Sequence, residues 1–163
     1  MFRVQIMNVR RAKNKDIRQI LEMLSQVLEV HASFRPDIFI PNTTKYGEDD
    51  LQKMIENDNN YIYVVVDDND NAIAYAFCEL QIPKFSRTNV QHKYFYIDDF
   101  CVDEKHRKKH IGEKLFKHVI EEAKRLDCYE IVLACWEGNN VASKFYEKMG
   151  MKVRKTTMEL IIK

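Results

Sequence analysis

The stretch CVDEKHRKKHIGEKLFKHVIEEAKRL, residues 101–126, joins a basic run to the start of a helix. Every residue from Lys105 to His110 is lysine, arginine or histidine. Beyond this run, apolar side chains recur at 3.6-residue spacing and predict an amphipathic helix; they are Ile111, Leu115, Phe116, Val119, Ile120, Ala123 and Leu126. Because the start of a helix carries partial positive charge, cations placed there call for an explanation, and an anion bound between them would supply one.

Strand patterns lie on both sides of this helix. YFYIDDFCV precedes it at residues 94–102, and YEIVLACW follows it at 129–136. A strand, a long helix and a second strand predict a parallel pair joined by a crossover. Upstream, YIYVVV and AIAYAFCELQI flank a turn rich in Asp and Asn, which predicts an antiparallel hairpin over residues 61–82.

The two ends of the sequence complete the element order. A strand is expected over residues 2–12, with Phe2, Val4 and Ile6 on one face, followed by helices over residues 17–28 and 48–57. After the crossover come a short helix at 139–150, closed by Gly150, and a final strand at 151–163. The order β-α-α-β-β-β-α-β-α-β predicts an α+β fold of one domain, residues 1–163, with a mostly antiparallel central sheet.

Composition limits the classes of function. The 163 residues are 45% hydrophobic with a net charge of +1, so bulk charge does not favour a nucleic-acid or membrane partner. No apolar run approaches the roughly 18–20 residues that span a bilayer. The four cysteines contain no C-x-x-C pair, and the first residues do not have the pattern of a secretion signal. We therefore expect a reduced, cytoplasmic protein.

Three explanations compete for the basic run. A metal site could use His106 and His110, but no third ligand stands at a recognisable spacing, so no metal is expected. A nucleic-acid site could use Lys105 to Lys109, although no aromatic residues interleave with them. A phosphorylated cofactor fits a strand, a turn and a helix start, where free backbone amides and the helix dipole attract anions.

Two motifs in register resemble the Gcn5-related N-acetyltransferase family. RKKHIG at 107–112 is similar to its central signature of Arg or Gln, two residues, Gly, one residue, then Gly or Ala. NNVASKFYEKMGM at 139–151 is similar to its second signature, and IDDFCVDEKHR at 97–107 to its fourth strand. His110 stands where a glycine is usual, and His is among the residues that tolerate positive φ, so we expect the loop to persist.

The resemblance implies transfer of an acetyl group from acetyl-CoA to a primary amine by direct attack in a ternary complex. The pyrophosphate of acetyl-CoA would bind at the basic loop and helix start, and its pantetheine arm would pair with the fourth strand. The cofactor-binding residues so implied are Phe100, Cys101, Val102, Arg107, Lys108, Lys109, His110, Ile111, Gly112, Glu113, Asn139, Ala142 and Tyr146.

The resemblance also implies two catalytic candidates. Tyr146 would protonate the thiolate leaving group, because a phenol stays protonated at neutral pH. Asp98 would act as the base or bind the amine, although a water could serve as the base instead. Because adjacent strand residues face opposite sides, Asp98 and Asp99 are not expected to share one task. Asp99 is expected to make a structural hydrogen bond. Trp136 and the loop HASFRPDIF at residues 31–39 are expected to border the amine pocket.

Alternative functions remain open at this point. The same fold could hold an acyl-CoA sensor without catalysis, and a nucleic-acid module is the third candidate. The sequence does not name the amine acceptor. The family resemblance suggests a homodimer, and the expected partners are otherwise acetyl-CoA and the amine, with no nucleic acid and no membrane.

Overall fold

The computed structural model describes residues 7–163, so the expected alternation of Phe2, Val4 and Ile6 lies outside the described residues. Two short 3-10 helices, Asn14–Asp16 and Glu104–His106, precede the helices α1 and α3. The main elements are β1 (Asn8–Arg11), α1 (Ile17–Phe34), α2 (Glu48–Glu56), β2 (Asn60–Val66), β3 (Ala72–Gln81), β4 (Tyr94–Val102), α3 (Ile111–Arg125), β5 (Glu130–Leu133) and α4 (Asn140–Lys148).

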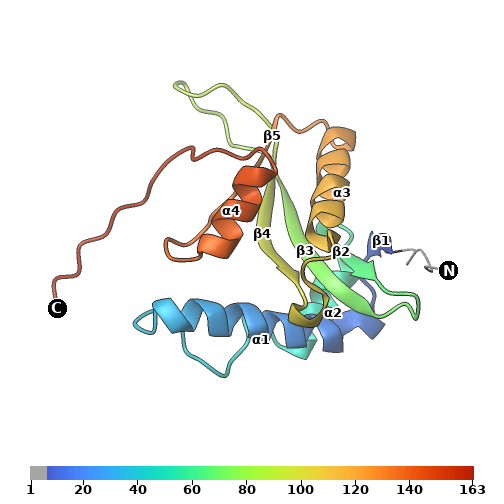
Figure 1. Cartoon of the computed structure of the whole chain (residues 1–163). Coiled ribbons are helices and arrows are strands. Elements are labelled where there is room, and N and C mark those ends of the chain that lie inside the picture. The colour runs from blue at the N-terminus through green and yellow to red at the C-terminus, as the bar shows by residue number, and fades with distance from the viewer. Residues whose placement is uncertain (1–6) are drawn as a thin grey trace.

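The strands form one sheet in the order β1-β2-β3-β4-β5. The first four pair antiparallel, and β5 pairs parallel to β4 after the crossover through α3. Helices α1 and α2 lie on one side of the sheet, and α3 and α4 lie on the other (Figure 1). The predicted α+β class, the mostly antiparallel sheet and the single parallel crossover are confirmed.

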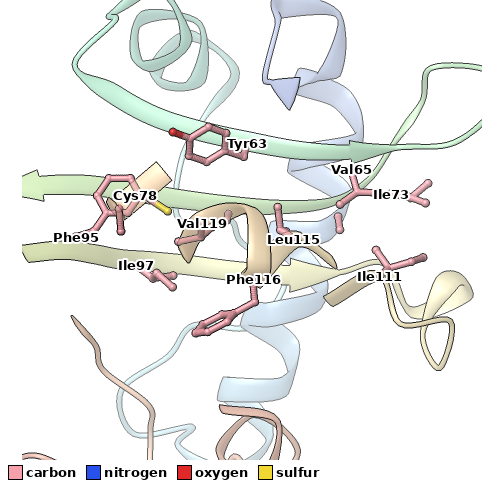
Figure 2. Packing of buried hydrophobic residues seen from close by; sticks show 13 residues of the cluster. Tyr63, Val65, Ile73, Cys78, Phe95, Ile97, Ile111, Leu115, Phe116 and Val119 are labelled. Atoms are coloured by element: carbon pink, nitrogen blue, oxygen red, sulfur yellow. The ribbon is translucent and has the colours of Figure 1, made fainter. Parts of the chain in front are cut away.

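Each face of the sheet has its own core. On one face, Leu115, Phe116 and Val119 of α3 pack against strand residues such as Phe95 and Ile97 (Figure 2). On the other face, α1 buries Ile20, Met23 and Leu24 against the sheet. Because both faces are covered, β3 is buried along residues 72–78, which explains its nearly continuous apolar sequence.

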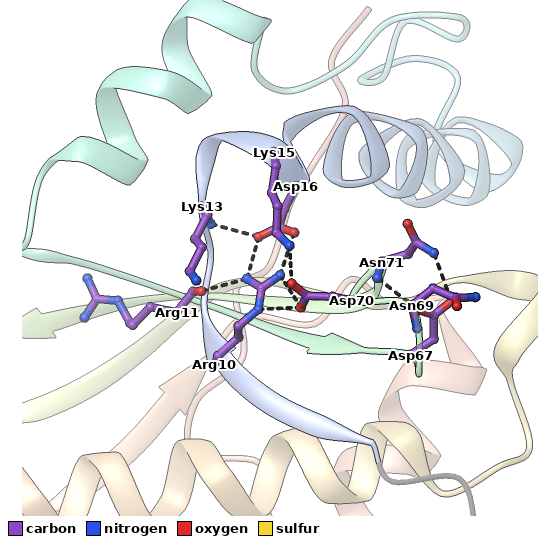
Figure 3. A network of polar contacts seen from close by, with 9 residues as sticks. All are labelled: Arg10, Arg11, Lys13, Lys15, Asp16, Asp67, Asn69, Asp70 and Asn71. Atoms are coloured by element: carbon purple, nitrogen blue, oxygen red, sulfur yellow. Dashed lines mark hydrogen bonds and ion pairs between the residues drawn. The ribbon is translucent and has the colours of Figure 1, made fainter.

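A buried ion pair ties β1 to the start of α1. Asp16 is 1% exposed, and its two carboxylate oxygens accept hydrogen bonds from the Arg10 guanidinium at 2.7 and 2.9 Å (Figure 3). The backbone amide of Lys13 donates to the same carboxylate at 2.8 Å. Arg10 also donates to Asp70 in the β2–β3 turn at 3.0 Å, so three chain segments meet at one guanidinium. This bonding with Asp16 raises the pKa of Arg10 despite its burial.

The predicted final strand at residues 151–163 is wrong. This segment has no regular secondary structure and extends away from the sheet (Figure 1). A strand needs a neighbouring strand to pair with, and no strand of the described residues pairs with this segment. Instead, the carboxylate of Glu159 accepts two hydrogen bonds, at 2.7 and 3.1 Å, from Arg35 at the end of α1.

Candidate active site

Strand β5 pairs along its whole length, but only with the first four residues of β4. Tyr94 to Ile97 pair with Glu130 to Leu133, and no strand of residues 7–163 pairs with Asp98 to Val102 on the β5 side. The backbone groups along this part of β4 are therefore free to bind a peptide-like ligand by strand addition. Phe100, Cys101 and Val102, the residues expected to meet the pantetheine arm, lie on this open edge.

The start of α3 lies beside the end of β4, where Gly112 approaches Val102. No side chain of the described residues caps the helix, and the amide of Lys114 donates the first hydrogen bond of the helix, to the carbonyl of His110 at 3.1 Å. The amides of Ile111, Gly112 and Glu113 precede it and therefore have no partner within the helix. Free amides at the positive end of a helix form an anion-binding site.

The loop before α3 adopts the conformation that the missing glycine would have allowed. His110 has φ 57° and ψ 17°, in the left-handed region, and Lys108 has φ 64°. The expectation that His110 tolerates positive φ is confirmed. Arg107 lies between these elements and donates from Nε to the carbonyl of Val102 at 3.3 Å. The loop thereby connects the end of β4 to the open helix start.

Positive charge surrounds the helix start. The side chains of Lys105, Arg107, Lys108 and Lys109 are all exposed. The one acid of the first turn, Glu113, lies beside Lys148 and within 3.1 Å of His110 Nδ1, and these partners lower its pKa. A surface hollow of about 340 Å³ at this end of α3 is lined by Met7, Lys109, His110, Glu113, Lys114 and Lys117.

Gly112 allows α3 to approach α4 closely. A Cβ at this position would lie 3.2 Å from Cε2 and 3.3 Å from Cζ of the Phe145 ring, and 3.5 Å from Cγ2 of Val102. A side chain here would push against α4 and the end of β4. The glycine of the first signature therefore also sets the position of the helix that carries Tyr146.

Both ends of α4 are fixed by hydrogen bonds. Asn139 Oδ1 accepts from the amide of Ala142 at 3.2 Å, which confirms that Asn139 caps the helix. At the other end, Gly150 has φ 92°, and the amide of Met151 donates to the carbonyl of Tyr146 at 3.0 Å. This Schellman ending confirms the expected role of Gly150 and holds the backbone of Tyr146.

The Tyr146 side chain lies in an aromatic setting with an unused hydroxyl. Its ring centroid is 6.2 Å from those of Phe100 and Phe116 and 5.3 Å from that of Phe145. The hydroxyl makes no hydrogen bond to any residue of the described range 7–163 and is not enclosed. Burial of the side chain, followed by the nearby Cys135 and Asp99, raises the pKa of Tyr146. The phenol is therefore a protonated donor without a protein acceptor.

Asp98 and Asp99 lie on the same side of the sheet, which corrects the expectation that they face opposite sides. Phe77 of β3 pairs with Asp99 and Cys78 pairs with Ile97, so Asp98 is an extra, bulged residue. A bulge resets the alternation of a strand. Both carboxylates consequently project toward the α1 side.

The partners of the two carboxylates differ. Asp98 Oδ2 accepts from Lys45 Nζ at 2.7 Å and from the Tyr46 hydroxyl at 3.0 Å. Asp99 Oδ1 accepts from the Tyr75 hydroxyl at 3.1 Å, so the expected structural hydrogen bond of Asp99 is present. Burial raises the pKa of Asp99 above its ordinary value, and it raises the pKa of Tyr46 to about 12.

Lys45 and Tyr46 were missed by sequence reasoning. They lie in the loop between α1 and α2, where no periodicity indicates which side chains point inward. The stacking of Tyr46 on Phe77 of β3, with ring centroids 5.8 Å apart, fixes this loop over the bulge. The loop therefore supplies a cation and a phenol directly to Asp98.

A second aromatic group lies beyond the end of β5. Trp136 meets Phe39 at a centroid distance of 5.2 Å, and the Arg35 guanidinium lies 5.7 Å from the indole centroid. Phe39 also lies 5.0 Å from His31. The structure thus brings Trp136 together with the loop at residues 31–39, the two segments expected to border an amine pocket.

Within residues 7–163, no cluster of three or more His, Cys, Asp or Glu side chains could hold a metal ion. His106 and His110 turn toward separate carboxylates, Asp103 at 2.7 Å and Glu113 at 3.1 Å. None of the helices described is both long and apolar enough to cross a membrane.

Comparison with known proteins places the chain in a family. The model of the acetyltransferase (GNAT) family matches residues 26–151, which include both signatures, the open edge of β4 and the start of α3. The chain therefore belongs to the acetyltransferase (GNAT) family. This membership supports acetyl transfer to an amine, with acetyl-CoA as the cosubstrate that the family uses.

Solved structures show the same fold. A mutant of the BH1408 protein from Bacillus halodurans is 31% identical, covers 95% of this chain and 99% of its own, and superimposes with a TM-score of 0.91. An aminoglycoside N-acetyltransferase in complex with CoA is 12% identical, with a TM-score of 0.68 over 98% of this chain and 96% of its own.

A curated relative matches over a shorter range. A glucosamine 6-phosphate N-acetyltransferase of Arabidopsis thaliana is 35% identical over 63 residues. The match spans 39% of this chain and 40% of the length of that relative.

Proposed function

We propose that the chain is an acetyl-CoA-dependent N-acetyltransferase that acts on a primary amine by direct attack in a ternary complex. One observation carries this proposal: the open edge of β4 borders both the uncapped start of α3, where Gly112 lies against Val102, and Tyr146, whose ring lies beside Phe100. These three features match the three parts of the cosubstrate, which are a peptide-like arm, a pyrophosphate and a thioester. The acetyltransferase domain is proposed to span residues 1–163.

Different groups of the chain would bind different parts of the cosubstrate. The backbone of Phe100 to Val102 offers the hydrogen bonds that an amide-containing arm needs. The amides of Ile111 to Glu113 would hold the pyrophosphate, assisted by Arg107, Lys108 and Lys109. His110, in its left-handed conformation, directs the backbone from the basic loop into α3. The cap that joins Asn139 to Ala142 would orient α4 beside the cosubstrate.

Tyr146 is proposed as the general acid. When an amine nitrogen forms a bond to the thioester carbon and the carbon–sulfur bond breaks, the sulfur leaves as a thiolate and needs a proton. The raised pKa keeps the Tyr146 hydroxyl protonated, and that hydroxyl has no competing acceptor among residues 7–163. The backbone amides on the open edge of β4 are candidates to stabilise the developing oxyanion.

The carboxylates at the bulge are proposed to receive the amine. Asp98 would bind the ammonium or take its proton, directly or through a water. Asp99, on the same side of the strand, accepts from the Tyr75 hydroxyl, and burial raises its pKa. The pH profile of kcat/KM for Asp98→Asn tests this assignment, and an unshifted profile of full height would contradict it.

Direct transfer is favoured over an acetyl-cysteine intermediate. Burial raises the pKa of the Cys101 thiol to about 12, and burial also raises the pKa of Cys128 and Cys135. A thiol must ionise to act as a nucleophile. These cysteines therefore stay protonated at neutral pH, which supports attack by the amine itself.

Two experiments test the proposal against its alternatives. A thermal shift with CoA separates a CoA-binding protein from a nucleic-acid module that uses Lys105 to Lys109. Release of free thiol from acetyl-CoA, measured over a panel of glucosamine 6-phosphate, an aminoglycoside, a polyamine and a lysine peptide, separates an enzyme from an acyl-CoA sensor. Stabilisation by CoA without amine-dependent thiol release would favour the sensor.

A further inference from the structure

The two carboxylate oxygens of Asp98 have different surroundings. Oδ2 accepts hydrogen bonds from both Lys45 Nζ, at 2.7 Å, and the Tyr46 hydroxyl, at 3.0 Å. Oδ1 accepts no hydrogen bond from any residue of the described range 7–163, and it is not enclosed. One oxygen is therefore occupied by a cation and a phenol of the chain itself, while the other is open to a ligand.

The Tyr46 ring fixes the position of Lys45 over this carboxylate. Of residues 40–50, Tyr46 alone is not exposed. Its ring stacks on Phe77 with an interplanar angle of 22°, and Lys45 Nζ lies 5.4 Å from the centroid of the same ring. The ring anchors an otherwise exposed loop, so the Lys45 ammonium group is a built-in part of the surface around Asp98.

Other titratable groups near this ion pair contribute less charge. Burial raises the pKa of Asp99 and lowers the pKa of His31, and each shift favours the neutral form. Glu79 lies on β3, opposite the residue two positions before Asp98, so its strand position is roughly 7 Å or more away. Because the energy between charges falls with distance, Lys45 at 2.7 Å has the largest influence at Asp98.

This arrangement restricts the charge of a ligand. An ammonium group can bind Oδ1 of Asp98 without displacing Lys45. A second ammonium group of the same ligand would lie near Lys45 and be repelled, whereas a carboxylate or phosphate in that place would be attracted. The Lys45 side chain is 42% exposed, so water screens part of the effect, and we expect a preference of about 10-fold to remain.

We propose that Lys45 is a specificity-determining residue of the amine site. It occupies Oδ2 of Asp98, leaves Oδ1 for one ammonium group, and selects amines that carry an anionic group close to the amine over diamines and polyamines. The description of this ligand as an acetyl acceptor rests on the proposed function. The charge preference at Asp98 does not.

Binding of three small amines tests the preference without any activity measurement. β-Alanine, propylamine and 1,3-diaminopropane are similar in length and end in a carboxylate, a methyl group and a second ammonium group. Titration of the full chain with bound CoA is followed by NMR at the backbone amides of Asp98 and Asp99. We expect β-alanine to bind at least about 10-fold more tightly than 1,3-diaminopropane, with propylamine between them.

The variant Lys45→Met should lower this ratio of affinities at least about 10-fold, because it removes the cation that repels the second ammonium group. Lys84→Met makes the same change at an exposed lysine of the β3–β4 loop and should leave the ratio unchanged. Far-UV circular dichroism establishes that both variants are folded. If Lys45→Met does not fold, Lys45→Gln provides a second neutral replacement with the same expected result.

Three results would overturn the proposal. These are equal affinities of the three amines for the wild type, a ratio that persists without the charge of Lys45, and no shift at Asp98 and Asp99 with any amine up to about 50 mM. The proposed function fails in a different way. The expected charge preference without acetyl transfer to any amine would support this inference and contradict the enzyme, and acetyl transfer without the preference would do the reverse.

Discussion

The middle of the sheet and its β4–β5 edge differ in how completely they are buried. In the middle, the last five residues of β2 and the first seven of β3 are all buried, and the Arg10–Asp16 pair ties the neighbouring β1 to the start of α1. At the β4–β5 edge, neither β5 nor α4 contains a buried residue, and the strands separate after Ile97. The middle of the sheet supplies stability, and the β4–β5 edge leaves backbone groups free for a ligand.

Removal of the buried Asp16 carboxylate should have the largest effect on stability. Asp16→Ala should lower the free energy of unfolding by about 3 kcal/mol, because the largely buried Arg10 guanidinium would keep only the exposed Asp70 as a charged partner. Urea unfolding measures the change. The matched variant Asp70→Ala removes the exposed partner of the same guanidinium and should cost less than about 1 kcal/mol. Equal losses for the two variants would contradict the assigned importance of burial.

Removal of the Tyr146 hydroxyl at the β4–β5 edge should lower activity without lowering stability. Tyr146→Phe should lower kcat about 100-fold, the lower limit for loss of a positioned acid, because the ring still packs while the proton donor is gone. The thermal shift with CoA should stay as in the wild type. Tyr129→Phe, at an exposed tyrosine, is the matched control and should keep kcat. Full kcat for Tyr146→Phe with a verified substrate would exclude this role.

Asp99, next to the bulge, gives stability a pH dependence of opposite sign to that of the usual acid. Because the pKa of Asp99 is raised in the folded chain, its contribution to stability falls as pH rises from the unfolded value, near about 3.9, through the raised folded value. Asp99→Asn keeps an acceptor for Tyr75 and removes the buried charge.

Asp99→Asn should therefore be more stable than the wild type at pH 8, and the difference should disappear near pH 4. Thermal unfolding across this range measures it. Asp98→Asn is the control, since that change breaks the contact with Lys45 instead of relieving burial. A stability gain of the same size at both pH values would contradict the explanation from burial.

The smallest expected effect concerns the loop before α3. His110→Val should be less stable than His110→Gly by about 1–2 kcal/mol, because a β-branched residue is strained at positive φ and glycine is not. Chemical unfolding compares the two. Equal stabilities would show that this φ is not maintained in solution.

Sequence patterns predicted the crossover well and the site only in part. Helix α3 begins at Ile111 as expected, because its periodicity is local and strong. The bulge at Asp98 depends on pairing with β3, and the contact with Lys45 depends on how a loop folds over the sheet. Neither leaves a periodic signal. The segment 151–163 has the alternation of a strand, but alternation alone does not show whether a neighbouring strand is available to pair with it.

Amide hydrogen exchange with and without CoA tests the central claim most directly, because it needs no knowledge of the amine. We predict that CoA slows exchange at Phe100 to Val102 and at Ile111 to Glu113, while the buried amides of β2 and β3 stay unchanged. CoA binding without protection at these two segments would contradict the proposed placement of the cosubstrate between β4, β5 and the start of α3.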